Sequence, residues 1–289
     1  MVIVNIIGGL GNQLFQYAFG KYLEKEMKYD VKFDVHTNRV GENFTSRDLD
    51  ISKLNVQFAI ASQADIKNFK FWDKGVLWRI ERKVAQKNFL FSKRYIVQEN
   101  AHSILKNTPD NVYYDGYWQS YEYVDSVRET LLNEIKVSEI FYENYRSLLN
   151  EFESFDSVAI HIRRGDYINI KVNAKLFEVC DMDYYDKAIK LIKSTLPNAK
   201  FYIFTQDLEW AKENFSLDKF KIVEGNSAID DMMLMSFCKH NIIANSTFSW
   251  WSAWLNRNPN KLIISPLKWY KGKMNIQTIN LIPTNWIRI

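Results

Sequence analysis

Regular alternation of two kinds of segment in the second half of the chain constrains the fold more than any other feature. Short apolar runs, typical of strands buried on both faces, alternate there with longer amphipathic segments that have helical spacing. Strands are expected at SVAIHI, KFYIFT, FKIVEG, NIIAN and LIISP, and helices at DYYDKAIKLIKSTL, LEWAKENF, IDDMMLMSFCKH and FSWWSAWLNR. This alternation predicts an α/β fold, with a mostly parallel sheet covered by helices on both faces.

The first residues of the chain show the same kind of pattern. An apolar strand expected at 2–7 leads through a glycine-rich turn into an amphipathic helix at 12–27 and a second strand at 30–35. Together they predict a βαβ unit. Residues 40–150 are more mixed and more aromatic. The elements expected there are helices around 62–88 and 121–150 and a short strand at NVYYDGYW.

Two patterns of this type predict two Rossmann-like domains. A chain of 289 residues with 47% hydrophobic residues can form two such cores. We place the boundary near residue 153, between an N-terminal α/β domain (1–152) and a C-terminal domain (153–289). Open parallel sheets bind ligands at the carboxyl ends of their strands, so we expect the two domains to face each other across a ligand-binding cleft.

Composition excludes several classes of protein. The net charge of +4 and pI near 8.8 are too mild to indicate nucleic-acid binding. Cys180 and Cys238 match no metal or CxxC spacing, which favours a reducing compartment and no structural zinc. The N-terminus lacks the basic region and cleavage site of a signal peptide, and no run of about 18 apolar residues occurs. We therefore expect a cytoplasmic protein that does not span a membrane.

The segment GGLGNQ lies between the first expected strand and helix. Gly8, Gly9 and Gly11 can adopt positive φ there and let backbone amides approach an anion at the helix N-terminus. The segment is not the dinucleotide-binding motif, because Leu14 stands where the third glycine belongs. Two interpretations stay open, a cradle for a phosphate or carboxyl group and a tight turn with no ligand.

The segment HIRRGD brings three potential cations to the end of a buried strand. Arg163 and Arg164 suit a diphosphate, because guanidinium groups bind its oxygens in a bidentate manner and stay charged. His161 precedes them. The alternatives are an Arg–Asp surface pair within the motif and an adhesion-type RGD, which requires an extracellular protein.

Two further segments follow strands of the C-terminal domain. FTQD places Asp207 where a carboxylate could contact a base or ribose, or cap the next helix. NSTFSWW combines Asn245, Ser246 and Thr247 with the first turn of a helix, whose amides can bind phosphate. The tryptophans that follow are more typical of core packing than of sugar binding. These are Trp250, Trp251 and Trp254.

Two other features carry weaker indications. DLD (48–50) and DMD (181–183) match the D-x-D pattern of metal-dependent sugar transferases, but DMD also has the form of a helix cap. Residues 66–95 hold nine Lys/Arg against Asp73 and Glu81. With Trp72, Trp78, Phe89 and Phe91 among them, this stretch indicates contact with an anionic membrane surface or a lipid-pyrophosphate acceptor. A solvated basic helix with its aromatic side in the core explains the pattern equally well.

GGLGNQLFQYAFG, HIRRGDY and IIANSTFSWWSAWL, in this order and at these separations, resemble the signature segments of the bacterial α-1,2-fucosyltransferases. DGYWQS and DDMMLMSFCKHNIIAN resemble connecting segments of that family. The resemblance covers nearly the whole chain. It implies a GT-B fold and an inverting glycosyltransferase that moves L-fucose from GDP-fucose to the 2-hydroxyl of a terminal galactose, without a required metal or other cofactor.

The resemblance also implies roles for individual residues. Arg163 matches the arginine that grips the β-phosphate, and Asp207 matches a carboxylate on the guanosine side. Asn12 and Gln13 match a turn facing the sugar-phosphate, and Ser246–Ser249 match the loop around the diphosphate. The donor-binding residues expected on this basis are Gly9, Gly11, Asn12, Gln13, His161, Arg163, Arg164, Asp207, Asn245, Ser246, Thr247, Phe248 and Ser249.

The expected catalytic residues are Arg163, His161 and Asp166. Asp166 either accepts the proton of the acceptor hydroxyl or orients the arginines, and Asp34 and His36 are rival bases. Some distant relatives carry a glutamate five residues after this aspartate, where the present chain has Lys171. The expected acceptor is a surface glycan such as an O-antigen, carried on a lipid at the cytoplasmic face of the inner membrane. A nucleotide- or sugar-binding α/β protein without catalytic activity, an NAD-dependent oxidoreductase and a fucosyltransferase of another linkage are the alternatives.

Overall fold

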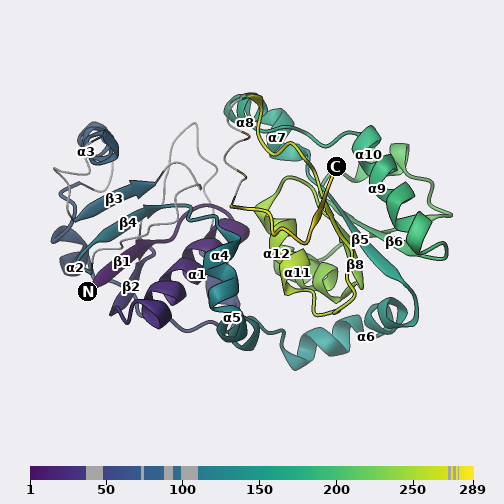
Figure 1. The fold of residues 1–289 in the computed structure, drawn as a ribbon, viewed down its shortest axis with the longest axis horizontal. Coiled ribbons are helices and arrows are strands. Elements are labelled where there is room, and N and C mark those ends of the chain that lie inside the picture. The colour runs from purple at the N-terminus through teal and green to yellow at the C-terminus, as the bar shows by residue number, and fades with distance from the viewer. Residues whose placement is uncertain are drawn as a thin grey trace. The chain divides into compact units, whose positions relative to one another are not determined.

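The computed structural model describes residues 1–36, 48–72, 75–87, 94–98, 110–272, 275, 278 and 280–289. The chain divides into two compact units, each built around one parallel sheet (Figure 1). Unit 1 comprises Met1–Lys136 and Gln277–Leu281, and unit 2 comprises Val137–Ile276 and Ile282–Ile289. The predicted α/β class is confirmed.

The sheet of unit 1 has the strand order β2-β1-β4-β3, and every pairing described in it is parallel. Its strands are β1 (Val2–Asn5), β2 (Val31–Asp34), β3 (Tyr95–Gln98) and β4 (Tyr113–Gly116). The apolar residues of β1 are buried on both faces, as expected of a central parallel strand. The predicted βαβ unit is therefore present, and β3 is an edge strand that the sequence analysis missed.

Helix α1 (Leu10–Glu26) connects β1 to β2 and packs tightly on the sheet. Gly20 makes this close approach feasible, because a Cβ atom there would lie 2.3 Å from Cζ of Phe33 in β2. The other helical elements of unit 1 are η1 (Asp50–Lys53), α2 (Gln63–Lys67), α3 (Gly75–Lys87), α4 (Tyr121–Ser126) and α5 (Arg128–Glu134).

The sheet of unit 2 has the order β10-β9-β8-β5-β6-β7, again with parallel pairing throughout the described strands. Its strands are β5 (Ser157–Ile162), β6 (Lys200–Thr205), β7 (Phe220–Val223), β8 (His240–Ile242), β9 (Ile263–Ser265) and β10 (Ile287–Arg288). All but β10 were predicted. The central strand β5 is buried along its whole length.

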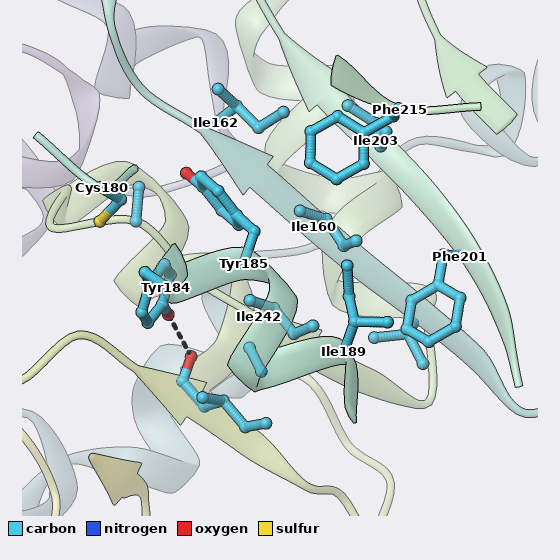
Figure 2. Close-up of a cluster of buried hydrophobic side chains, with 14 of the residues drawn as sticks. Ile160, Ile162, Cys180, Tyr184, Tyr185, Ile189, Phe201, Ile203, Phe215 and Ile242 are labelled. Carbon is cyan, nitrogen blue, oxygen red and sulfur yellow. Dashed lines mark hydrogen bonds between the residues drawn. The ribbon is translucent and has the colours of Figure 1, made fainter. Parts of the chain in front are cut away.

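Figure 2 shows part of the core of unit 2, where Tyr185 and Ile189 of helix α9 pack against strand residues such as Ile160 and Ile203. The Tyr184 hydroxyl donates to the carbonyls of Ile243 (2.6 Å) and Ile264 (3.3 Å). The helices of unit 2 are α6 (Glu139–Ser154), α7 (Gly165–Asn169), α8 (Lys171–Leu176), α9 (Met182–Thr195), α10 (Leu208–Asn214), α11 (Ala228–Phe237) and α12 (Thr247–Leu255).

Helix α6 belongs to unit 2, so the division of the chain falls between Lys136 and Val137 and the boundary predicted near residue 153 is wrong. The buried ring of Phe152 packs edge-on against Tyr202 of β6, with 4.7 Å between the ring centroids. Glu151 on the same helix accepts hydrogen bonds from the Tyr202 hydroxyl (3.0 Å) and from Lys221 (2.6 Å). These contacts with β6 and β7 attach α6 to the sheet of unit 2. No local sequence pattern predicts them.

The tryptophans of NSTFSWW and the following turn pack in the core of unit 2, as predicted. Trp250, Trp251 and Trp254 of α12 are buried against one another. Cys180 and Cys238 are buried free thiols. Among the described residues, no helix is both long and apolar enough to cross a lipid bilayer.

Candidate functional site

Polar side chains gather at the carboxyl edge of the unit 2 sheet. Strands β8, β5 and β6 are parallel neighbours, so the residues that follow them meet along the same edge. Arg163 and Arg164 follow β5, Asp207 follows β6, and Ser246 lies just beyond β8 at the start of α12. The HIRRGD, FTQD and NSTFSWW segments are thereby brought to one place.

Arg164 is held on two sides. Its Nε donates to Oδ2 of Asp207 at 3.2 Å, and its guanidinium carbon lies 4.3 Å from the centroid of the Trp210 ring. The other carboxylate oxygen of Asp207 caps helix α10 by accepting from the Trp210 amide at 3.4 Å. The helix-cap interpretation of Asp207 is therefore confirmed, and its contact with a nucleotide stays a prediction. Trp210 is not among the site residues predicted from the sequence.

Arg163 is positioned by an aromatic stack. Its guanidinium carbon lies 5.7 Å from the centroid of Tyr167, whose ring stacks on Phe177 with 4.4 Å between centroids. The Tyr167 hydroxyl donates to the carbonyl of Asn245 at 2.9 Å. The segment that carries Arg163 is thus tied to the loop that opens α12. Tyr167 is the second site residue that the sequence analysis missed, although it belongs to the HIRRGDY segment.

His161 is buried at the end of β5, and its ring lies 5.5 Å from that of Phe248 in α12. Burial, assisted by the charge of Arg163, lowers the pKa of His161 to about 3. The imidazole is therefore neutral near pH 7, and the predicted catalytic and donor-binding roles of His161 stay predictions. Its Nδ1 atom has no hydrogen-bond partner among the described residues. The positive charge of this edge comes from the two arginines.

The loop before α12 is fixed by its own buried side chains. Asn245 is fully buried and donates through Nδ2 to the carbonyls of Glu178 (2.6 Å) and Trp269 (2.8 Å). The Ser249 hydroxyl is also buried and donates to the carbonyls of Ala244 (3.4 Å) and Ser246 (3.3 Å). These two side chains stabilise the loop, and the Ser246 hydroxyl accepts from the Phe248 amide at 3.3 Å. An anion at this helix N-terminus would meet the other backbone amides of the first turn. The predicted donor contacts of Ser246, Thr247 and Phe248 stay predictions.

In unit 1, only one of the three glycines in the glycine-rich turn has the positive φ that was predicted. Gly8 has a φ of +80°, whereas Gly9 precedes α1 with a φ of −75° and Gly11 lies within the helix. The expectation of positive φ at Gly9 and Gly11 is therefore wrong. A Cβ atom at Gly9 would meet no atom within 4 Å, which leaves open space at the helix N-terminus.

Gln13 holds this turn together. Its side-chain amide donates to the carbonyls of Gly8 (2.7 Å) and Asp48 (2.8 Å), and its oxygen accepts from the amide of Ile51 (2.9 Å). The side chain is buried and hydrogen-bonded through both its nitrogen and its oxygen, so it stabilises the turn. Asn12 is half-buried and accepts from Gln119 at 2.8 Å. Gln119 comes from the DGYWQS segment, so the two family-like segments of unit 1 also meet.

Asp34 is only 1% exposed, and its carboxylate accepts hydrogen bonds from the described residues around it. The Tyr113 hydroxyl (2.6 Å), Lys70 (3.2 Å) and the His36 amide (2.9 Å) all donate to it. Burial acts to raise the pKa of Asp34, but these partners outweigh it and lower the pKa. An enclosed, stably ionised carboxylate is unsuited to accepting a substrate proton, which argues against Asp34 as the rival base. His36 is exposed, and the side chain of Asp166 lies outside the described part of the structure.

The two D-x-D segments have local partners. Asp181 caps α9 by accepting from the amide of Tyr184 at 3.0 Å, so the helix-cap interpretation of DMD is confirmed. Asp50 pairs with Lys53 at 2.7 Å. Within the described ranges, no three His, Cys, Asp or Glu side chains cluster as a metal site requires.

The sequence as a whole matches the family model described as glycosyl transferase family 11, over residues 1–289. The chain belongs to glycosyl transferase family 11. This confirms the predicted family. The structure supplies the parallel α/β units expected of such a transferase.

Similar proteins agree with this assignment to family 11. An α-1,2-colitosyltransferase from Escherichia coli is 32% identical over 300 residues, covering 100% of this chain and 99% of the relative. The O-antigen biosynthesis glycosyltransferase WbnK, also from Escherichia coli, is 31% identical over 303 residues, with 98% of each chain covered. A crystal structure of the fucosyltransferase NodZ from Bradyrhizobium has a TM-score of 0.50 at 13% identity, covering 87% of this chain and 91% of that chain. The GT-B-like fold class is confirmed by this likeness.

Proposed function

We propose that this family 11 glycosyltransferase moves L-fucose from GDP-fucose to the 2-hydroxyl of a terminal galactose on a surface glycan such as an O-antigen. The full-length relatives named as an α-1,2-colitosyltransferase and an O-antigen biosynthesis glycosyltransferase support an α-1,2 linkage and a surface glycan acceptor. The family resemblance of the three motif segments supports fucose as the sugar.

The observation that carries the proposal is the meeting of two arginines with a helix N-terminus at one sheet edge. Arg163 and Arg164 leave β5 beside the first turn of α12, as the contact between the His161 and Phe248 rings shows. Two guanidinium groups and a row of helical amides are complementary to a diphosphate. Among sugar donors, this favours a nucleoside diphosphate sugar.

In the proposed reaction the bond between the fucose C1 and the diphosphate oxygen breaks as the acceptor oxygen approaches C1 from the opposite side. The sugar passes through an oxocarbenium-like state, and GDP leaves with the negative charge of the broken bond. Arg163, Arg164 and the α12 amides would stabilise that charge in the transition state more than in the ground state. His161 is buried and neutral, so it contributes no charge to this stabilisation.

The acceptor hydroxyl loses a proton during transfer. With Asp34 enclosed, Asp166 and His36 remain the candidates for a base, and Asp166 can alternatively orient the arginines. Asp166→Asn separates these roles. Loss of a base lowers kcat and preserves the GDP dissociation constant, whereas loss of an orienting partner weakens GDP binding as well. We expect the second result, because neighbouring arginines lower the basicity of a carboxylate.

A second candidate is transfer of colitose, favoured by the identity of 32% to the α-1,2-colitosyltransferase. Colitose is L-fucose without its 3-hydroxyl, so the two donors place the same diphosphate at the same edge. A site that hydrogen-bonds a sugar hydroxyl strongly rejects an analogue lacking it, whereas an apolar site discriminates weakly. Donor preference is therefore a property of the sugar pocket.

The test measures transfer from GDP-fucose and GDP-colitose to a panel of β-galactosides with the purified full-length protein. We expect kcat/KM to be higher for GDP-fucose, with a product linked to the galactose 2-hydroxyl. A higher kcat/KM for GDP-colitose would select the second candidate. Thermal stabilisation by UDP or NAD but not by GDP would contradict both.

A further inference from the structure

Helix α3 of unit 1 is fastened to the sheet by one face. Ala85 is buried in the cluster that includes Ile3 and Tyr95. Arg82 donates from Nε to the buried carboxylate of Asp115 at 3.0 Å, and the half-buried Trp78 lies on the same side, 5.9 Å from the Arg82 guanidinium. Figure 1 shows α3 beside β3, the edge strand of the sheet. Its orientation is therefore determined.

The opposite face of α3 is apolar and exposed. Helical spacing places four aliphatic side chains within one stripe of about 100°. These are Val76 (70% exposed), Leu77 (53%), Ile80 (53%) and Val84 (47%). Single exposed apolar residues are ordinary on protein surfaces, but a continuous stripe of them indicates a surface that is covered in use.

Two aromatic residues extend this stripe. Phe71 is 81% exposed and Trp72 is 41% exposed, with 5.7 Å between their ring centroids. Their backbone amides donate to the carboxylate of Glu81 at 3.0 and 3.2 Å, which ties the aromatic pair to α3. The same two bonds occupy the carboxylate of Glu81, the acidic side chain nearest the stripe on this helix.

The charge beside the stripe is positive. Arg79 and Lys83 are exposed and lie one turn apart along its border. They belong to the segment in which nine Lys/Arg stand against two acidic residues. Basic residues flanking an apolar stripe with Phe, Trp and Leu are the composition of helices that lie in the headgroup region of an anionic bilayer.

We infer that this surface, the α3 face, docks on an anionic lipid bilayer. We define the α3 face as Phe71, Trp72, Val76, Leu77, Ile80, Val84, Arg79 and Lys83. The aliphatic and aromatic side chains enter the headgroup region, and Arg79 and Lys83 pair with lipid phosphates. A second copy of the chain is a poorer partner, because a symmetric contact would bring these cations against their own equivalents. The inference does not depend on which sugar is transferred.

The α3 face differs in part from the surface that the sequence indicated. Trp78 is half-buried on the inner side of the helix beside Arg82, so it is not part of the α3 face. Phe89 and Phe91 lie outside the described residues. The interpretation of α3 as a solvated basic helix agrees with the exposure of Arg79 and Lys83 and with the inward side of Trp78, but it does not account for the exposed aliphatic stripe.

The experiment is co-sedimentation of the full-length protein with vesicles of phosphatidylcholine alone or mixed with phosphatidylglycerol, at low and high salt. We expect binding to the anionic vesicles that weakens with salt. Leu77→Ser/Ile80→Ser/Val84→Ser should weaken it at least tenfold. Arg79→Gln/Lys83→Gln should weaken it roughly 10- to 30-fold and remove the preference for anionic lipid. The control Ile140→Ser/Leu217→Ser removes exposed aliphatic side chains from unit 2 and should bind as the wild type does.

Four results would overturn the inference. They are absence of vesicle binding, equal and salt-insensitive binding to neutral vesicles, equal loss in the control variant, and concentration-dependent self-association that the α3 variants abolish. Thermal unfolding of each variant checks that it is folded. If the triple serine variant unfolds, vesicle binding by Arg79→Gln/Lys83→Gln tests the inference instead. Both of its substitutions are at exposed positions, so it should stay folded.

Discussion

At the scale of single residues, burial decides which members of the HIRRGD segment carry charge. His161 and Arg163 are two positions apart, yet the first is neutral and buried while the second is half-exposed and charged. An imidazole can lose its proton when water is removed, whereas a guanidinium cannot. The candidate site therefore combines two permanently charged arginines with a buried, neutral His161.

The buried His161 should make stability depend on pH. Its folded pKa of about 3 lies below the value of 6.5 for an ordinary histidine, so the unfolded chain takes up a proton first as the pH falls. Its contribution to stability is complete above about pH 6.5 and is lost progressively toward pH 3. We expect a loss of about 2 kcal/mol between pH 7 and pH 5 from this group. Urea unfolding at both pH values should show a smaller loss for His161→Asn, and an unchanged difference would contradict the assignment.

Arg163→Lys should lower turnover by about two orders of magnitude while changing the free energy of unfolding by less than about 1 kcal/mol. A lysine point charge cannot reproduce a two-pronged grip on phosphate, and the half-exposed side chain contributes little to the core. The matched control is Arg128→Lys, at the ion pair with Asp125 on unit 1. Near-normal turnover of Arg163→Lys would show that Arg163 does not bind the diphosphate in the transition state.

At the level of elements, helix α1 and the turn before it contain glycines with different roles. Gly20 faces the ring of Phe33, Gly8 needs its positive φ, and Gly9 borders open space. The sequence places Gly8 and Gly9 in the turn and Gly20 in the helix, but it does not show which of them has a close neighbour.

Gly20→Ala should destabilise the protein by about 3 kcal/mol, since the added methyl group would lie 2.3 Å from Phe33 Cζ. Gly9→Ala should cost about 1 kcal/mol or less, because its φ is ordinary and its surroundings are empty. If Gly9 contacts the donor, Gly9→Ala should nevertheless lose transfer activity. Denaturant unfolding and a transfer assay on both variants measure the two effects, and equal destabilisation would refute the distinction.

At the level of the complete chain, each unit is built on a parallel sheet, and the predicted site residues lie at the carboxyl ends of its strands. In unit 2 this edge presents arginines and helical amides, and in unit 1 it presents the Asn12–Gln119 pair. The expectation that the two domains face each other across a cleft stays a prediction.

We predict that transfer requires no added metal, because two guanidinium groups and the α12 amides can neutralise the departing diphosphate. After treatment with EDTA, the initial rate of transfer should stay within about twofold of the untreated rate, a change of under about 0.5 kcal/mol in the barrier. Activity that is abolished by EDTA and restored by manganese would contradict this.

The alternation of apolar and amphipathic segments was enough to predict the α/β class, the strands of unit 2 other than β10, helices α9 to α12, and the position of each motif at the end of a strand. Hydrophobic periodicity is a local property, and parallel strands place their carboxyl ends together, so these features follow from residues close in the chain. Helices α7 and α8 were not predicted. The sequence also indicated the core role of Trp250 and its neighbours and the helix caps at Asp181 and Asp207.

The surroundings of each predicted site residue depend on contacts that form when the chain folds. Gln13 and Asn245 stabilise their loops because they donate hydrogen bonds to carbonyls that are distant in the sequence. His161 is neutral because the surrounding core excludes water. Helix α6 belongs to unit 2 because it contacts β6. The aliphatic stripe of α3 faces outward because Ala85 and Arg82, on the opposite side of the helix, contact the sheet. Desolvation and long-range hydrogen bonding depend on residues brought together by folding, and no local pattern contains them.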